Sequence, residues 1–520
     1  MEKYNKFIKS KTYYFVRVFP FIDSDQEKPV TDINKISATP FWLAEEILEL
    51  TLDRNVMQLD SEFSLVLYQS ENFIFESEMH IKPGDWVVIY KTSSGGFTDP
   101  DLKVIEETIE VKIDGAVKKF VVFKRGFGQV ERAESDWSVT NEGTCINTMF
   151  VSGRTFGKFL SDANLYFNPF QEGNMKPAMI PASIKIPQGN MKNAITEILS
   201  FAMAMNQVVL PQTIMSEKVF AEQENEIKPK DNINVIKDFK GSTAFNILNL
   251  KIDDTTSETF IDYHTVEDGS VENLIKYFSD QVKNEVYCDL IWDAKIKALS
   301  PTLVIRETPY TIKSIWDNKY KQSSDLPRNY FEDQFTYEID WEDGTINRFR
   351  IGRSSHEIFN YFVTTGRMYP QGEMLNKQEQ MNFENIQIEA GKSTNKIARF
   401  GLKIKQASTI YDNYSRKGNQ GGTIFNTSEE YSRLQRHWFS DMDLKYSGTI
   451  SGHFPNYLRL GTRIRVLNVP VKTKTGIDKR VFEAYVVGIT DSFQAPNIPL
   501  ITLRVHYGRI LKTTNSRQAS

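Results

Sequence analysis

Cysteine is scarce in this chain, which contains only Cys145 and Cys288 among its 520 residues. Two cysteines cannot build the disulfide framework of a small secreted protein, so the sequence indicates folding in a reducing cytosol. Long apolar runs are missing as well, because no stretch approaches the roughly 18 uninterrupted apolar residues of a membrane span. The N-terminal run MEKYNKFIKSKTYYF has no apolar core followed by a small-residue cleavage site. We therefore expect no secretory signal and no membrane anchor.

The signatures of several enzyme classes are also missing. The run KRGFGQ (124–129) has two glycines, but neither the spacing nor the following helix of a phosphate-binding loop. No HExxH zinc motif, no CxxC pair and no GxSxG nucleophile elbow occurs. Adjacent carboxylates such as Glu45-Glu46, Glu106-Glu107 and Asp253-Asp254 point to different faces of a strand, which favours surface charge over an acid/base pair. The sequence predicts no catalytic residue and no cofactor-binding residue, and we expect that the protein is not an enzyme.

Histidine is rare too, with six residues in the chain. The best candidate for a metal site is His437 with Asp441 and Asp443, because His437 and Asp441 lie one helical turn apart. A structural histidine beside a solvated acidic edge explains this group more simply. We predict no metal-binding residue and no metal cofactor.

The composition that is present is that of a globular protein of about three or four domains, with 40% hydrophobic and 25% charged residues. Aromatic residues make up 12%, enough for large cores and broad contact surfaces. The net charge of −4 is unevenly spread, because residues 441–520 hold twelve Lys or Arg against five Asp or Glu. A nucleic-acid binder, a subunit that docks on an acidic neighbour and a simply solvated basic end all fit this asymmetry.

The first third of the chain has the pattern of β-structure. Leu48, Leu50 and Leu52 alternate with polar residues, and so do Phe63, Leu65 and Leu67. The run IKPGDWVVIYK (81–91) predicts a turn at Pro83-Gly84 and then a strand in which Trp86, Val88 and Tyr90 alternate. Further strands are expected in 118–133 and 145–153, with a loop over 91–101. Short strands separated by turn residues indicate an antiparallel sandwich or small barrel.

The rest of the chain is mixed. Apolar periodicity predicts helices over 191–207 and from Ser270, and residues 217–230 read as an exposed loop or boundary. A strand is expected within 297–316, bracketed by Pro301 and Pro309, and a hairpin turns at Glu342-Asp343-Gly344. Capping boxes predict helices after Ser354–Glu357, ending at Gly366, and after Thr427–Glu430. The polar stretch 371–422 reads as an inserted or mobile region.

Two parts of the chain share an order of features. In the first, IKPGDWVVIYK is followed by FVVFKRGFGQVE and INTMFVSGRTFG; in the second, LRLGTRIRVLN is followed by EAYVVGITDSFQAP and LITLRVHYGR. Each part has a glycine turn, an alternating strand, a strand that turns through glycine, and a closing strand. The order indicates an internal duplication, although any two β-segments look alike at this level.

These same residues resemble a family. The run ILELTLDRNVMQLDSEFSLVLYQS, with IKPGDWVVIY, FKRGFGQVERAESDW and TMFVSGRTFGKFLSD, resembles the first barrel of the baseplate hub proteins of contractile phage tails. Late control protein D and the hub portion of VgrG spikes are related members. KALSPTLVIRETPY is similar to the segment that joins the halves, and DLKYSGTISGHFPNYLRLGTRIRVLN with AYVVGITDSFQAP and LITLRVHYGR is similar to the second barrel. The resemblance covers roughly residues 12–165 and 285–510, and segments 166–285 and 371–425 match nothing in the family.

The resemblance implies a fold that is mainly β with α+β inserts, in which two similar small antiparallel β-barrel (tail-tube-like) domains are accompanied by insert domains. The expected boundaries are 1–165 for the first barrel, 166–300 for a mixed α/β insert, 301–350 for connecting strands and a hairpin, 351–440 for a helical or irregular insert, and 441–520 for the closing strands of the second barrel.

The resemblance also implies a structural role. Two similar barrels per chain in a homotrimer give six similar units, which adapt a hexameric tail tube ring to a trimeric central spike and enclose the DNA channel. The implied partners are the tail tube protein, the spike protein and baseplate wedge or tape measure proteins, with DNA only as passing cargo. Because no spike domain follows Ser520, the piercing element is expected to be a separate chain. The implied location is the virion tail baseplate, assembled in the host cytoplasm.

Three other functions stay open at this point. The chain fits a tail-tip hub of a long flexible-tailed phage, a cell-wall hydrolase with β-domains, and a nucleic-acid-binding protein that uses the basic residues 441–520. Nucleic-acid binding that weakens as salt is added would favour the last of these functions. Clearing of host cell walls that is lost when one Glu or Asp is replaced would favour the second.

Overall fold

The fold is described from a computed structural model of the chain. The residues that it describes are 13–20, 40–68, 81–92, 106–113, 115–139, 145–166, 184–186, 189–205, 247–252, 260–261, 264–266, 268–279, 284–293, 298–307, 336–354, 358–366, 387–390, 394–409, 439, 444–454, 456, 458–474, 476–495 and 499–511. Strands dominate these residues, and one 14-stranded sheet holds most of them. The predicted mainly β class is confirmed.

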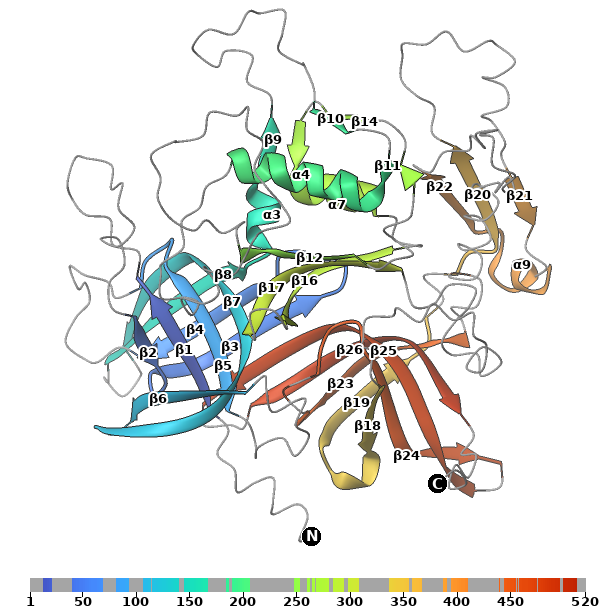
Figure 1. Cartoon of the computed structure of the whole chain (residues 1–520). Helices are drawn as coiled ribbons and strands as arrows, with labels where there is room; N and C mark the ends of the chain where they lie inside the picture. Colours follow the sequence, from blue (N-terminus) through green and yellow to red (C-terminus); the bar gives the residue numbers. More distant parts are fainter. Residues whose placement is uncertain are drawn as a thin grey trace, which may run out of the picture.

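The large sheet consists of two sets of six strands. The first strand set contains β1 (Tyr14–Phe19), β3 (Ile47–Asn55), β4 (Glu62–Tyr68), β5 (Trp86–Thr92), β7 (Ala116–Val139) and β8 (Cys145–Thr155). The second strand set contains β18 (Thr336–Asp340), β19 (Ile346–Gly352), β23 (Tyr446–Gly452), β24 (Arg463–Thr473), β25 (Gly476–Gln494) and β26 (Leu500–Leu511). Two more strands, β2 (Phe41–Leu43) and β6 (Glu107–Ile113), pair with β1 and β7. Figure 1 shows the two sets side by side in the lower part of the molecule.

The two sets have the same strand order. In space the first runs β3-β4-β8-β7-β5-β1 and the second runs β19-β23-β26-β25-β24-β18, and corresponding strands follow in the same order along the chain. The match extends to single hydrogen bonds. In the first set, the Gly84 N–H donates to the Val130 carbonyl and the Val130 N–H donates to the Asp85 carbonyl. In the second set, the Gly461 N–H donates to the Val486 carbonyl and the Val486 N–H donates to the Thr462 carbonyl. One difference is that β1 pairs antiparallel with β5, whereas β18 pairs parallel with β24. The order predicted from the sequence repeat is therefore present in the structure.

The interruptions of the ladders recur as well. A register shift lies between Val130 and Arg132 where β7 pairs with β8, and the corresponding shift lies between Val486 and Gly488 where β25 pairs with β26. Another pair of shifts lies between Ile47 and Glu49 in β3 and between Ile346 and Arg348 in β19. Because a bulge reverses which face a side chain points to, its position sets the register of everything beyond it. These matching bulges relate β7 to β25 and β3 to β19 residue by residue, whereas the shift between Tyr446 and Gly448 in β23 has no counterpart in β4.

A smaller bridging sheet lies between the strand sets and the helices. It contains β12 (Asn249–Ile252), β16 (Asn284–Asp293) and β17 (Ala298–Glu307), with β17 in the centre. Above it lie α3 (Lys158–Asp162), α4 (Met191–Met205) and α7 (Val271–Phe278), together with the short strands β9 (Asn164–Tyr166), β10 (Ile184–Ile186), β11 (Gly189–Asn190), β13 (Phe260–Ile261), β14 (His264–Val266) and β15 (Asp268–Ser270). Both helices predicted in this region, α4 and α7, are confirmed. The Ser270 hydroxyl caps α7 by accepting from the Asn273 N–H at 3.1 Å.

The core has buried side chains on both faces of the first strand set. In β5, Trp86, Val88 and Tyr90 join a cluster that includes α4, α7 and the bridging sheet, while Val87 and Ile89 join a second cluster inside the set. The alternation predicted for 81–91 is present, but its second face is buried rather than solvated, because helices and the bridging sheet cover it. The second strand set encloses its own cluster, centred on β24, β25 and β26.

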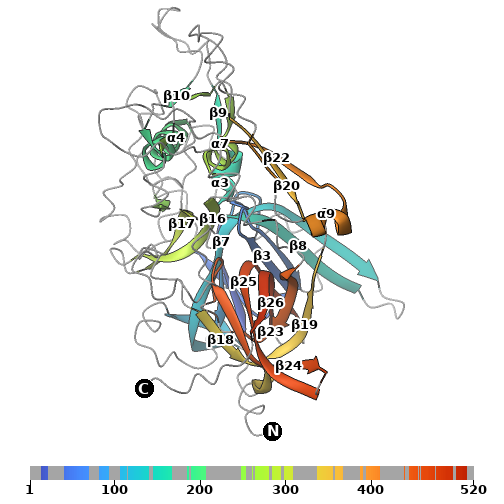
Figure 2. The ribbon, with the colours of Figure 1, turned by 90° about the vertical axis from the view of Figure 1, so that its right-hand side faces the viewer.

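Residues 361–366 contradict one prediction. The capping box at Ser354–Glu357 predicts a helix ending at Gly366, but Tyr361–Gly366 forms strand β20. β20 pairs antiparallel with β21 (Gln387–Ala390) and parallel with β22 (Ile404–Thr409), beside helix α9 (Thr394–Phe400). The run YFVTTG consists largely of β-branched and aromatic residues, which fit a pleated sheet better than a helix. This three-stranded sheet lies at the side of the molecule, as Figure 2 shows.

Two further expectations were wrong in detail. The turn at Gly344 exists, with φ of 67° after the short 3-10 helix η4 (Trp341–Asp343), but the flanking strands do not form a hairpin. β18 pairs with β24, and β19 pairs with β23, so the turn carries the chain from one side of the second strand set to the other. Pro301 does not bracket a strand either, because it lies inside β17 opposite Leu290. The predicted loop at 217–230, the helix after Thr427–Glu430 and Pro309 lie outside the described residues.

Candidate functional site: the junction of the two strand sets

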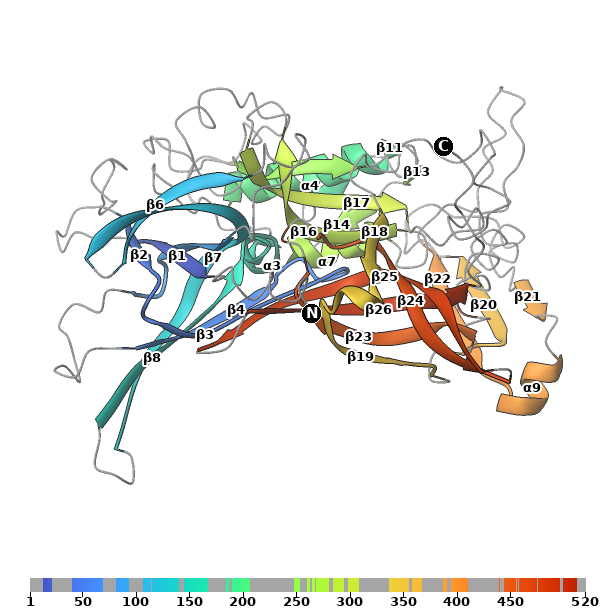
Figure 3. The same cartoon turned by 90° about the horizontal axis from the view of Figure 1, so that it is seen from below.

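The two strand sets join through one antiparallel strand pair. Residues 488–494 of β25 pair with residues 49–55 of β3, from Gly488 opposite Asn55 to Gln494 opposite Glu49. The ladder is extended by the Val56 N–H, which donates to the Val487 carbonyl, and by the Ala495 N–H, which donates to Leu48. Because β25 is still paired with β26 on its other side, the sheet passes without a break from one set into the other. Figure 3 shows β3 and β25 running together at the centre of the molecule.

A buried carboxylate lies at the centre of this junction. Asp491 in β25 accepts two hydrogen bonds from Arg125 of β7, at 3.1 Å from Nε and 2.7 Å from Nη2. Arg54 of β3 donates from Nη2 at 3.1 Å, and the Tyr14 hydroxyl donates at 3.1 Å. The side chains of Asp491 and Arg125 are almost completely buried. One carboxylate of the second strand set is therefore held by three strands of the first.

Arg54 connects this cluster to the bridging sheet. Its Nη1 lies 3.2 Å from the Asp289 carboxylate in β16, while its Nη2 is bonded to Asp491. Arg125 also donates to the backbone carbonyl of Asn456, whose side-chain amide in turn donates to the Thr92 carbonyl at 2.8 Å. The two strand sets and the bridging sheet thus meet at Arg54 and Arg125. We refer to Tyr14, Arg54, Arg125, Asp289 and Asp491 as the junction cluster.

The electrostatics of the junction cluster follow from this geometry. Burial alone would raise the pKa of Asp491, but Arg125, Arg54 and Lys91 hold that pKa well below its ordinary value. Burial disfavours the charge of Arg54, yet Asp289 and Asp491 raise its pKa. Burial raises the pKa of the Tyr14 hydroxyl, and the nearby Asp491 raises it further. All three groups therefore keep the protonation states that these hydrogen bonds require.

Lys91 is a buried lysine beside the junction cluster. Its pKa is lowered to about 8 by burial, against an opposing effect of Asp491. Its ammonium lies 5.7 Å from the centre of the Tyr14 ring. The charged form of Lys91 is therefore costly in the folded protein, in contrast to the well-compensated Asp491.

A second buried ion pair joins the bridging sheet to the second strand set. The Arg306 guanidinium of β17 donates to the Glu285 carboxylate, and also to the Gly461 carbonyl at 2.7 Å and the Tyr485 hydroxyl at 2.9 Å. The Tyr485 hydroxyl donates to the other oxygen of Glu285. Gly461 has φ of +71°, and a Cβ at this position would lie 2.0 Å from Arg306 Nη2. Only glycine therefore fits this contact.

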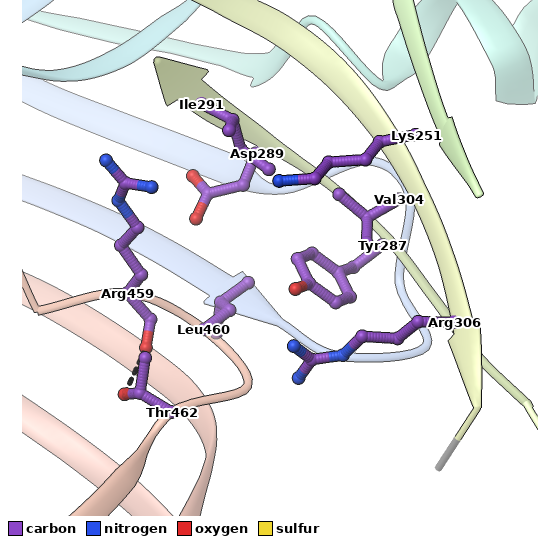
Figure 4. Close-up of a pocket in the computed structure, with 9 residues that line it drawn as sticks. All are labelled: Lys251, Tyr287, Asp289, Ile291, Val304, Arg306, Arg459, Leu460 and Thr462. Carbon is purple, nitrogen blue, oxygen red and sulfur yellow. Dashed lines mark hydrogen bonds between the residues drawn. The ribbon is translucent and has the colours of Figure 1, made fainter. Parts of the chain in front are cut away.

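The pockets near the junction are small. One, of about 20 Å³, is lined by Lys251, Asp289, Arg306 and Arg459 among others, and Figure 4 shows their charged ends facing one another across it. Another of about 20 Å³ lies beside Arg54 and Ser61. Such a volume holds about one water molecule. The pockets therefore suit ordered water between charged groups, and neither has room for a metabolite.

The junction cluster was missed by the sequence interpretation, which placed no functional residue in these strands. KRGFGQ, examined as a phosphate loop, contains Arg125, and its Gly126 and Gly128 lie in β7 rather than before a helix. The available signal was the position of Arg125 and Asp491 on the apolar side of otherwise alternating strands. The metal candidate His437, Asp441 and Asp443 lies outside the described residues, as does Asp253-Asp254. Within the described residues no cluster of three or more His, Cys, Asp or Glu could hold a metal ion.

Tail proteins are among the solved structures to which this chain is similar. No protein-family model matches the chain, and no curated protein matches it. Among solved structures, the chain is similar to the 43 kDa tail protein of prophage MuSo2 from Shewanella oneidensis, with 10% identity, a TM-score of 0.45 and coverage of 95% of this chain and 97% of that one. A tail protein from Neisseria meningitidis MC58 matches with 10% identity, a TM-score of 0.45 and coverage of 96% and 97%. The Francisella PdpA–VgrG complex matches with 9% identity, a TM-score of 0.38 and coverage of 97% of this chain and 55% of that one.

Among the helices that the structure describes, none has the length and apolar character needed to cross a membrane.

Proposed function

We propose that this protein is a structural hub of a phage tail baseplate. Three chains form a ring of six similar strand sets, which adapts a hexameric tail tube to a trimeric central spike and encloses the channel for DNA. The observation that carries this proposal is the duplicated strand set, matched in strand order and in the bulges of β7 and β25 and of β3 and β19. A chain that presents the same surface twice is suited to imitate two neighbouring subunits of a six-membered ring.

The junction cluster supports a structural role in a second way. A hub that carries force between tube and spike needs its two halves held at a fixed angle. Asp491, Arg54 and Arg125 are buried and bonded across the halves, which fixes both separation and register. The small pockets beside the cluster add no space for a substrate. We infer that the cluster is an assembly feature and that the protein acts by binding rather than by catalysis.

The proposed partners follow from the ring. Six similar strand sets would present a sixfold surface to the tail tube ring on one side, and the threefold repeat of the chain would seat the spike on the other. Wedge or tape measure proteins would contact the outer insert regions, and DNA would pass through the channel as cargo. The assembled protein would belong to the virion, after assembly in the host cytoplasm.

The experiment that tests this function measures the mass of the purified chain by light scattering. A trimer of about 180 kDa, three times the 60.0 kDa chain, is the expected result, and averaged electron micrographs should show a ring with six similar lobes. Addition of purified tube protein and spike protein should give a larger complex. A chain that stays monomeric at every concentration and with both partners would overturn the proposal. The proposal would also be overturned if the purified chain cleared host cell walls and a variant with one carboxylate replaced did not.

A further inference from the structure

The equivalence of the two strand sets identifies two strand edges, one on β7 and one on β19, along which no second strand is paired among the described residues. In the junction, residues 488–494 of β25 pair with residues 49–55 of β3. Residues 132–138 of β7 are equivalent to residues 488–494 of β25. Residues 348–354, which cover most of β19 and the two residues after it, are equivalent to residues 49–55 of β3. Residues 132–138 pair with β8 on one edge only, and β19 pairs with β23 on one edge only, in the part of the chain that the structure describes.

We propose that β7 of one chain pairs antiparallel with β19 of a second copy, in the register of the internal β25–β3 junction. The proposal deepens the proposed function, on which it rests only for the number of chains in the ring. It assigns the interface itself to residues 132–138 and 348–354. The contact is head-to-tail, because each copy offers one β7 edge and one β19 edge, so it leads to a closed ring or a filament.

The register follows from the matched bulges. Val130 and Val486 make the same hydrogen bonds, and both precede a bulge of one residue, so a constant offset relates β7 to β25. In the same way the shared bulge relates β3 to β19. Transferring the internal pairs, Asp136 falls opposite Arg350, Trp137 opposite Phe349, and Ser138 opposite Arg348.

The side chains at these positions are complementary. On one face of the proposed ladder, Asp136 of β7 falls directly opposite Arg350 of β19, and all the charged residues on this face are exposed in the single chain. Glu134, which pairs with Arg132 in the single chain, lies diagonal to Arg350, and Arg348 lies diagonal to Asp136. Opposite charges directly across a strand pair stabilise it, whereas like charges destabilise it. Three arginines, Arg348, Arg350 and Arg353, lie within six residues at this edge of the second strand set. The charge pattern therefore favours this partner over a random protein surface.

The other face explains an exposed tryptophan. Trp137 is 48% exposed in the single chain, although large aromatic residues usually bury most of their surface. Its equivalent in the junction is Phe493, which lies opposite Leu50 and packs against the first strand set near Tyr14. Trp137 would lie opposite Phe349 in the same way. The β7–β8 ribbon that carries Trp137 projects from the body in Figure 3, as an arm that reaches a neighbour would.

The test is a cysteine pair in a Cys145→Ser background. Ser138→Cys and Arg348→Cys are placed opposite each other across the proposed ladder, at a separation suited to a disulfide. Under mild oxidation the double variant should form a series of disulfide-linked oligomers that ends at a closed ring. Mixing the two single variants should give dimers only, because the contact is head-to-tail. Ser138→Cys with Lys479→Cys, an exposed residue on another strand, is the matched control and should not cross-link.

Charge exchange gives an independent readout. Asp136→Arg alone and Arg350→Asp alone should each weaken assembly, by about fivefold per contact, and the double exchange should restore it. A trimer without the predicted cross-link and without rescue overturns this interface and leaves the proposed function standing. Cross-linked rings that do not contain three chains support the interface and overturn the proposed function. A monomer in all variants overturns both.

Discussion

Replacing Asp491 by Ala removes the one carboxylate that holds two buried guanidiniums at the junction. Arg54 keeps Asp289 at 3.2 Å, but Arg125 loses both of its bonds to Asp491 and keeps the Asn456 carbonyl. Removing one partner of a buried ion pair typically costs about 3–5 kcal/mol, because the other charge is left uncompensated. We expect Asp491→Ala to lower the free energy of unfolding by this amount.

The assay is guanidinium unfolding, followed by tryptophan fluorescence and by circular dichroism. Two probes are needed because the chain exceeds the size for which a single transition can be assumed. The control is Asp478→Ala, whose carboxylate forms an exposed ion pair with Arg480 at 3.3 Å and should contribute no more than about 1 kcal/mol.

A double variant tests the reasoning further. In Asp491→Ala with Arg125→Met, the uncompensated charge leaves together with its partner, so the loss should be smaller than the sum of the two single losses. If Asp491→Ala costs no more than Asp478→Ala, or if the two single losses simply add, the junction cluster does not couple the two strand sets.

Acid supplies a second measurement on the same residue. Since the pKa of Asp491 is held below its ordinary value in the folded protein, the unfolded chain binds more protons as the pH falls below about 4. The stability that Asp491 provides is therefore present above this pH and is lost on acidification. Asp491→Asn should flatten this part of the pH profile, and an unchanged slope would show that the carboxylate has no such role.

Three other predictions concern single residues. Lys91→Met should stabilise the protein below pH 8, because burial lowers the pKa of Lys91 to about 8. The free energy of unfolding of the wild type should rise between about pH 8 and 10.5, because the unfolded chain binds more protons than the folded chain in this range. A flat pH profile would contradict this. Gly461→Ala should cost more than Gly84→Ala in a thermal melt, since both have positive φ but only the first would displace Arg306; equal losses would mean that the clash is relieved cheaply. Cys288, whose pKa is raised by burial, should resist alkylation in the folded protein and react on unfolding when the other cysteine is replaced by Ser, and rapid labelling of the native chain would refute its burial.

Local patterns predicted much of the fold. These patterns depend only on residues a few positions apart in the sequence. Examples are the strand alternation at Leu50 and Leu52, the glycine turns at Gly84 and Gly461, and the helix cap at Ser270. The order of the duplicated strands followed from the same signals, because each turn and strand is specified locally.

The errors arose where distant partners decide the outcome. A helix-start signal precedes Tyr361–Gly366, but this segment forms a strand because it pairs with β22, which lies about forty residues later in the chain. The junction cluster was out of reach for a related reason, because Arg125 and Asp491 are separated by 366 residues. A charged residue within an apolar pattern is a signal that something compensates it, yet the pattern does not say what.

The depth at which charges lie has a consequence for how the particle comes apart. Inside one chain, the seam between β3 and β25 is closed by ions shielded from solvent, which salt screens little. The proposed seam between copies adds to its backbone ladder and its Trp137 contact carboxylates and guanidiniums that lie at the surface of the single chain, where 1 M salt shortens electrostatic reach to about 3 Å. Concentrated salt should therefore weaken the seams between copies before the seam inside each chain, so the species released should be whole protomers.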